Sequence, residues 1–167
     1  MTAAALVVGA FALVLVAVLV AGVLRTQARL AQRLEMLEAG PSGDPVYGVA
    51  GVTPEGDAIE LDLADPAGPR LLVFLTTTCV TCAEIWPTLG RDARVVAITK
   101  DERDERPARL RELAGTDVTV VMSAEAWSAF GVRVAPYAVL TDPATGTAIA
   151  RGPVVTWRDV ARIGRAG

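Results

Sequence analysis

Apolar residues run without interruption through the first part of the chain. Residues 3–24 consist only of alanine, leucine, valine, glycine and phenylalanine. As an α-helix this segment is about 33 Å long, enough to cross a hydrocarbon core of roughly 30 Å. A cleaved signal peptide is the alternative, but it requires a shorter apolar run preceded by basic residues. No Lys or Arg precedes the run, and the pattern therefore favours a retained transmembrane anchor.

The next residues combine an apolar stripe with regularly spaced arginines. Residues 25–39 place Arg every fourth position and Leu on a single helical face, which predicts a short amphipathic helix. Residues 40–45, of sequence Gly-Pro-Ser-Gly-Asp-Pro, end that helix and form a linker. The expected organisation is a transmembrane anchor over 1–24, a juxtamembrane helix and linker over 25–45, and one domain over 46–167.

The basic residues near the span bear on its orientation. Arg25, Arg29 and Arg33 directly follow the apolar run. The positive-inside rule places this end of the span, and the domain after it, in the cytoplasm.

Beyond the linker, strand patterns alternate with helix patterns. Residues 59–63 alternate apolar and acidic side chains, which predicts an edge or half-exposed strand. Short apolar runs predict buried strands over 71–75, 94–98 and 118–122, and a hairpin over 137–140 and 147–150. Helices are expected to follow Cys79, and over 107–114, 123–130 and 156–163. The order predicts an α/β fold with a mostly parallel sheet covered on both faces and an antiparallel end hairpin.

Charge narrows the range of functions. With 16 Lys and Arg against 19 Asp and Glu, the formal net charge is only −3. No basic patch interleaved with aromatic residues occurs, so nucleic acid is not expected as a partner. The one dense charge run, residues 101–106, is expected to form a solvated loop before the helix that starts at Pro107.

The chain has two cysteines, Cys79 and Cys82, spaced as CxxC between a buried strand and a helix. Residues 76–78 are three threonines that offer an N-cap hydroxyl. Cys79 is then expected in the first helical turn, where free N–H groups and the helix dipole favour a thiolate. A thiolate attacks disulfides, and a second sulfur three residues later can resolve the product. CxxC near a βαβ pattern indicates redox chemistry.

Three other interpretations of the pair stay open. A CxxC pair can be half of a zinc site, but zinc usually takes four ligands, and the chain has no other Cys and no His. The pair can form a structural disulfide, although so short a loop constrains the unfolded chain little. The pair can also be two reduced, buried and passive thiols.

With these motifs the sequence resembles the thioredoxin superfamily. The CxxC opens a helix after a buried strand, Pro87 follows eight residues after Cys79, and residues 131–136 lead through Ala135-Pro136 into a strand. Gly152 lies near the last-strand glycine of that fold. The sequence also resembles the membrane-anchored TlpA-like branch and, within it, the MauD-like accessory proteins of methylamine utilisation. This resemblance rests on the order of anchor, stalk and domain, and on Phe74-Leu75, residues 123–125, Ala129-Phe130 and residues 136–142.

The resemblance implies a thioredoxin-like fold, a mixed sheet with helices on both faces, and thiol–disulfide oxidoreductase activity. It implies Cys79 as the nucleophile, Cys82 as the resolving cysteine, and Ala135 and Pro136, joined by a cis bond, as substrate-binding residues. No cofactor or metal is expected beyond the redox-active Cys79–Cys82 disulfide. The implied partners are protein thiol or disulfide substrates, an unidentified redox partner and a membrane. Because members of this branch are generally extracytoplasmic, the resemblance implies a single-pass protein of the bacterial plasma membrane with an extracytoplasmic thioredoxin domain, although Arg25, Arg29 and Arg33 argue for a cytoplasmic one.

The chain departs from the thioredoxin pattern at three places. Thr78 stands where thioredoxins carry Trp, Val73 lies where their buried acid would fall, and Val80-Thr81 separates the cysteines. The missing acid and missing Trp support a second hypothesis, a non-catalytic membrane-anchored binding or assembly module with the same fold.

Overall fold

The computed structural model describes residues 46–166. The predicted anchor over 1–24 and the predicted juxtamembrane helix and linker over 25–45 lie outside these residues. Within residues 46–166, none of the helices has the length and apolarity needed to cross a bilayer.

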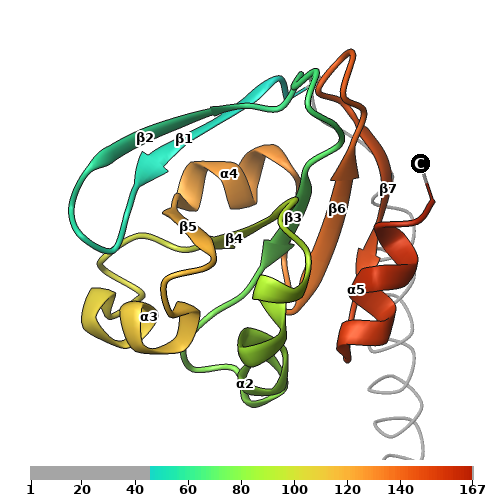
Figure 1. Cartoon of the computed structure of the whole chain (residues 1–167). Coiled ribbons are helices and arrows are strands. Elements are labelled where there is room, and N and C mark those ends of the chain that lie inside the picture. Colours follow the sequence, from blue (N-terminus) through green and yellow to red (C-terminus); the bar gives the residue numbers. More distant parts are fainter. Residues whose placement is uncertain (1–45, 167) are drawn as a thin grey trace, which may run out of the picture. The chain divides into compact units, whose positions relative to one another are not determined.

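Seven strands form one sheet in the order β2-β1-β5-β4-β3-β6-β7 (Figure 1). The strands are β1 (Gly48–Val52), β2 (Ala58–Asp62), β3 (Leu71–Phe74), β4 (Val95–Thr99), β5 (Thr119–Met122), β6 (Tyr137–Thr141) and β7 (Ala148–Pro153). The parallel strands β3, β4 and β5 form the centre, with Leu71 opposite Val95 and Thr99 opposite Met122. All residues of β3 and β4 are buried. Their continuous apolar runs are those of strands covered on both faces.

Both edges of the sheet are antiparallel hairpins. At one edge β6 pairs with β3 and β7 pairs with β6, as the predicted end hairpin requires. At the other edge β1 pairs with β2 along five residues and reaches β5 through the single pair Val52 and Met122. The expectation of a mostly parallel sheet was therefore wrong, because β1 was not predicted and adds a second antiparallel hairpin. The sheet is mixed.

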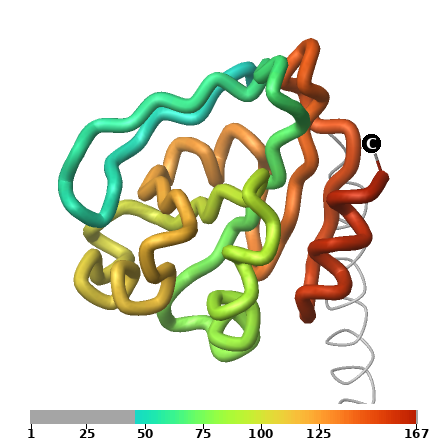
Figure 2. The backbone as a smooth tube through the Cα atoms, in the orientation of Figure 1, coloured from blue at the N-terminus to red at the C-terminus, as the bar shows by residue number. Residues whose placement is uncertain are grey.

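Helices cover the two faces of the sheet. They are α2 (Val80–Ile85), the 3₁₀ helix η1 (Trp86–Arg91), α3 (Pro107–Ala114), α4 (Ala124–Ala129) and α5 (Trp157–Ile163). Alternate residues of β3 point to opposite faces. Leu71 and Val73 pack in one cluster with side chains from α2, η1, α3 and α5, whereas Leu72 and Phe74 pack in a second cluster with α4. Figure 2 follows the chain through these layers.

The helix ends follow the local sequence. Ser123 caps α4, because its Oγ accepts a hydrogen bond from the backbone N–H of Ala126 at 3.2 Å. Thr156 and Asp159 form a capping box at the start of α5. The helix expected to follow Cys79 changes character at Pro87, which lies in the first turn of η1. A proline supplies no N–H, and the α-helical pattern stops just before it.

Candidate active site

The sulfur of Cys79 caps helix α2. Cys79 has extended backbone angles, φ −81° and ψ 119°, and its Sγ accepts a hydrogen bond from the backbone N–H of Cys82 at 3.2 Å. The expected threonine cap was wrong, because the helix begins after Cys79 and the threonines precede it. The sulfur of Cys79 therefore lies at the N-terminus of α2, where the N–H of Cys82 is directed at it.

The two thiols differ in their surroundings. Both are free cysteines, Cys79 partly exposed and Cys82 fully buried. Burial, and then the hydrogen bond with Cys79, raises the pKa of Cys82 to about 12. At neutral pH Cys82 therefore holds its proton, and Cys79 is the thiol that solvent and partners can reach.

Ala135 and Pro136 precede strand β6 and lie next to the cysteine pair, although they are more than 50 positions away in the sequence. The Ala135–Pro136 peptide bond is cis, the isomer that the resemblance implies. The Cys79 thiol donates to the carbonyl oxygen of Ala135 at 3.8 Å. Pro136 is hydrogen-bonded to the residue that follows β7, because its carbonyl oxygen accepts from the N–H of Val154 at 3.1 Å. The structure thus brings together Cys79, Cys82, Ala135 and Pro136; the roles assigned to them stay predictions.

Three exposed apolar side chains belong to residues that adjoin this group in the sequence or through a hydrogen-bonded neighbour. Val80, between the cysteines, is 85% exposed, and Val134, which precedes Ala135, is 46% exposed. Val155 is 60% exposed and follows Val154, the residue bonded to Pro136. We call these three side chains the valine rim. Val80 is the first residue of α2, whereas Val134 lies before β6 and Val155 lies between β7 and α5.

A buried carboxylate also reaches the site, and sequence reasoning missed it. Glu105 is only 4% exposed, although it lies in the charge run 101–106 that was expected to be solvated. Its Oε2 accepts from the backbone N–H of Thr77 at 2.9 Å and from the Thr77 hydroxyl at 2.5 Å. No signal in the sequence separates Glu105 from its charged neighbours, because its burial depends on a contact with a residue 28 positions away.

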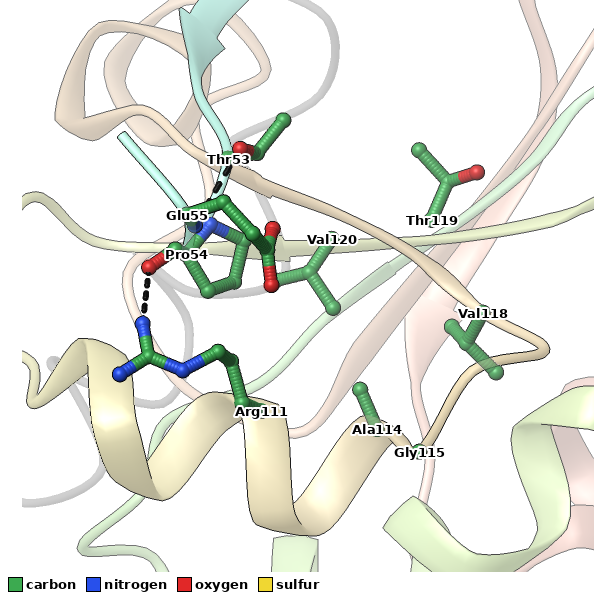
Figure 3. Close-up of a pocket in the computed structure, with 9 residues that line it drawn as sticks. All are labelled: Thr53, Pro54, Glu55, Arg111, Ala114, Gly115, Val118, Thr119 and Val120. Carbon is green, nitrogen blue, oxygen red and sulfur yellow. Dashed lines mark hydrogen bonds between the residues drawn. The ribbon is translucent and has the colours of Figure 1, made fainter. Parts of the chain in front are cut away.

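Two other features of the described residues lie apart from the site. Across residues 46–166, no cluster of three or more His, Cys, Asp or Glu side chains is arranged to hold a metal ion. A pocket of about 230 Å³ lies between the β1–β2 turn, α3 and the start of β5 (Figure 3). Arg111 closes one side of it by donating to the carbonyl of Pro54 at 2.5 Å. Neither cysteine lines this pocket.

The fold and the site define a thioredoxin-fold protein with a CxxC pair beside a cis-proline loop. Solved structures share this fold. The exposed lipoprotein thioredoxin Etrx1 of Streptococcus pneumoniae is 15% identical with a TM-score of 0.57, covering 69% of this chain and 95% of that one. The thioredoxin domain of a thiol-disulfide oxidoreductase from Bacteroides vulgatus is 16% identical with a TM-score of 0.55, covering 74% and 98%. A thio-disulfide isomerase from Thermus thermophilus is 19% identical with a TM-score of 0.54, covering 75% and 96%.

A curated relative adds similarity in sequence. The methylamine utilization protein MauD of Methylorubrum extorquens is 38% identical over 80 residues, which are 45% of this chain and 39% of that protein. The match thus spans about two fifths of the relative's length. No family model matches the chain. The predicted resemblance is confirmed as a similarity, because the solved structures share the thioredoxin-like fold and MauD shares sequence with this chain over 80 residues.

Proposed function

We propose that this protein is a membrane-tethered thiol–disulfide oxidoreductase that acts on protein disulfides through Cys79 and Cys82. The observation that carries the proposal is the asymmetry of the pair. Cys79 is partly exposed and accepts an N–H from Cys82, whereas Cys82 is buried with a pKa of about 12. Such an arrangement suits one attacking and one resolving sulfur.

The reaction runs in two exchanges. The Cys79 thiolate attacks one sulfur of a substrate disulfide, so a Cys79–substrate disulfide forms and one substrate thiolate leaves and takes up a proton. Cys82 loses its proton and attacks the Cys79 sulfur, which releases the second substrate thiol and leaves the Cys79–Cys82 disulfide. Two electrons pass from the cysteine pair to the substrate. The reverse sequence oxidises a substrate dithiol, and the direction depends on the redox partner.

The surroundings of Cys79 favour a protein over a small thiol as substrate. The valine rim offers exposed apolar side chains at positions adjacent in sequence to Cys79, Ala135 and Val154. Because residue 136 is proline, it has no backbone N–H to donate beside the sulfurs. An extended segment of a partner protein with apolar residues next to its cysteine fits this surface.

The same proposal includes attachment of the domain to a membrane and a biological role for its reaction. The apolar run over 3–24 would anchor the domain, and the similarity to MauD suggests a part in the maturation of extracytoplasmic redox proteins. Fractionation of cells should recover the full chain in the membrane. A thiol reagent that cannot cross membranes should label Cys79 in intact cells if the domain is extracytoplasmic, and only after lysis if it is cytoplasmic.

A mixed-disulfide trap tests the chemistry. The variant Cys82→Ser should accumulate covalent adducts with a protein disulfide such as insulin, and a reducing agent should release them. The matched control Cys79→Ser should form none. If Cys82→Ser forms no adduct and the wild-type pair does not exchange with disulfides, the non-catalytic binding or assembly module is the better description.

A further inference from the structure

Glu105 is the one buried member of the charge run over residues 101–106. Its side chain is 4% exposed, whereas Glu102, Arg103, Asp104 and Arg106 are exposed. Backbone hydrogen bonds from Asp104 and Glu105 to the carbonyl of Asp101, at 3.1 and 3.0 Å, turn the loop after β4. This turn separates Glu105 from its charged neighbours.

The carboxylate has no cationic partner among the described residues. None of the salt bridges within residues 46–166 includes Glu105. A buried charge is costly unless hydrogen bonds compensate it. The two bonds from Thr77 to Oε2 supply that compensation, and bonds to an ionised acceptor are stronger than neutral ones.

Thr77 is the middle residue of the loop over 75–79, which connects β3 to α2 and ends at Cys79. Both ends of this loop are fixed. The N–H of Leu75 donates to Ile98 in β4 at 3.0 Å, and Cys79 is bound to the N–H of Cys82. Thr76, next to Thr77, acts on the Cys82 thiol through hydrogen bonds that oppose the rise in its pKa. Movement at Thr77 would therefore displace the elements that align both sulfurs.

We propose that Glu105 is a positioning residue for the thiol–disulfide reaction: through Thr77 it holds the loop that sets Cys79 and Cys82 in place to form their disulfide. This inference rests on the proposed function. Without the clamp the loop samples more conformations, so closure of the disulfide costs more entropy and the disulfide becomes less stable.

The stability of the Cys79–Cys82 disulfide measures this role. Full-length protein in mild detergent is equilibrated with reduced and oxidised glutathione, and the thiols are then trapped by alkylation and counted by mass. One oxidised glutathione and the cysteine pair give two reduced glutathiones and the Cys79–Cys82 disulfide. Glu105→Ala is expected to lower this equilibrium constant about tenfold, which is about 30 mV. Glu105→Gln and Thr77→Val, which each weaken one part of the clamp, should lower it by roughly threefold.

The matched control is Glu102→Gln, which makes the same charge change at an exposed position of the same loop. Its equilibrium constant should equal that of the wild type. If Glu105→Gln and Thr77→Val lower the melting temperature but leave the constant unchanged, Glu105 is only structural and the inference is overturned. These two variants decide the matter even where Glu105→Ala does not fold. A wild-type pair that never exchanges with glutathione would instead remove the proposed function and, with it, this role.

Discussion

The sulfurs of Cys79 and Cys82 stand one helical turn apart but meet different environments. Cys79 is partly exposed at the start of α2, while Cys82 is enclosed in the core cluster with Ile85 and Trp86. Burial raises the pKa of the Cys82 thiol to about 12. The difference predicts which sulfur reacts first, and how the reduced protein responds to alkaline pH.

Alkylation should distinguish the two thiols. Iodoacetamide at pH 7.5 should label Cys79 at least about tenfold faster than Cys82, because only a reachable thiolate reacts. Peptide mass mapping after short exposure measures the two rates. The variant Cys79→Ser should lose the fast reaction and Cys82→Ser should keep it. Faster labelling of Cys82 in the wild type would reverse the assignment of the nucleophile.

Stability of the reduced protein should fall at alkaline pH. Cys82 keeps its proton in the folded state up to about pH 12, whereas the thiol in the unfolded chain loses it near the ordinary value of 9.0. Above pH 9 the unfolded state binds fewer protons, so the free energy of unfolding should decrease by up to about 1.4 kcal/mol per pH unit. Urea unfolding with a reductant present, from pH 8 to pH 10.5, measures the slope. In Cys82→Ser this contribution should be absent; an equal slope in both proteins would contradict it.

At the scale of the elements, the weakest join in the sheet is that between β1 and β5. One residue pair connects them, Val52 with Met122, and Gly51 lies against the end of β5. A Cβ at position 51 would stand 2.6 Å from the carbonyl oxygen of Met122 and 2.6 Å from Cγ1 of Val121. Glycine is therefore what allows the β1–β2 hairpin to approach the sheet.

The variant Gly51→Ala should destabilise the protein by about 1–3 kcal/mol, because the added methyl group forces strands apart. Chemical denaturation measures the loss. Gly152→Ala is the matched control in strand β7, where a Cβ would come no closer than 3.9 Å to another residue. That control should be neutral or slightly stabilising, through a less flexible unfolded chain. Equal stability of Gly51→Ala and wild type would show that the hairpin can shift without cost.

The elements also show what could be predicted from sequence. Strands β3, β4 and β5 were predicted to within one or two residues, and α3 at its observed bounds, because continuous apolar runs and the Pro107 start are local signals. Strand β1, of sequence Gly-Val-Ala-Gly-Val, gave too weak a pattern to be predicted. In the site, the CxxC pair and the Ala135–Pro136 loop were found through the resemblance. The burial of Glu105 and the sulfur cap of α2 depend on contacts that only the folded chain reveals.

At the scale of the whole molecule, the site combines residues from two distant parts of the domain sequence, the segment between β3 and α2 and the segment before β6. Cys79 caps α2, which follows central strand β3, and Ala135 leads into β6, which pairs with β3 along four residues. All the contacts described for the site come from residues 75–154. Residues 46–166 also belong to one compact unit. The folded domain should therefore carry the chemistry without the N-terminal segment.

Removal of residues 1–40 should give a soluble, folded and monomeric domain. Its melting temperature should agree with that of the full chain in detergent to within about 2–4 °C, the shift expected from less than 1 kcal/mol. Its Cys79 should react with iodoacetamide at the same rate. Circular dichroism, sedimentation and alkylation rates check these expectations. An insoluble or unfolded fragment would show that the N-terminal segment packs on the domain.

The separation of 56 positions between Cys79 and Ala135 along the chain has a consequence for biosynthesis. At 5–20 residues per second, roughly 3–11 s pass between synthesis of the first cysteine and synthesis of the segment that shields it. During this interval both thiols are open to oxidants. Because the chain has only two cysteines, a single intramolecular disulfide can form, and it is the one that the finished site uses. Oxidation of the nascent chain cannot scramble its connectivity, so the protein can mature in an oxidising compartment without an isomerase.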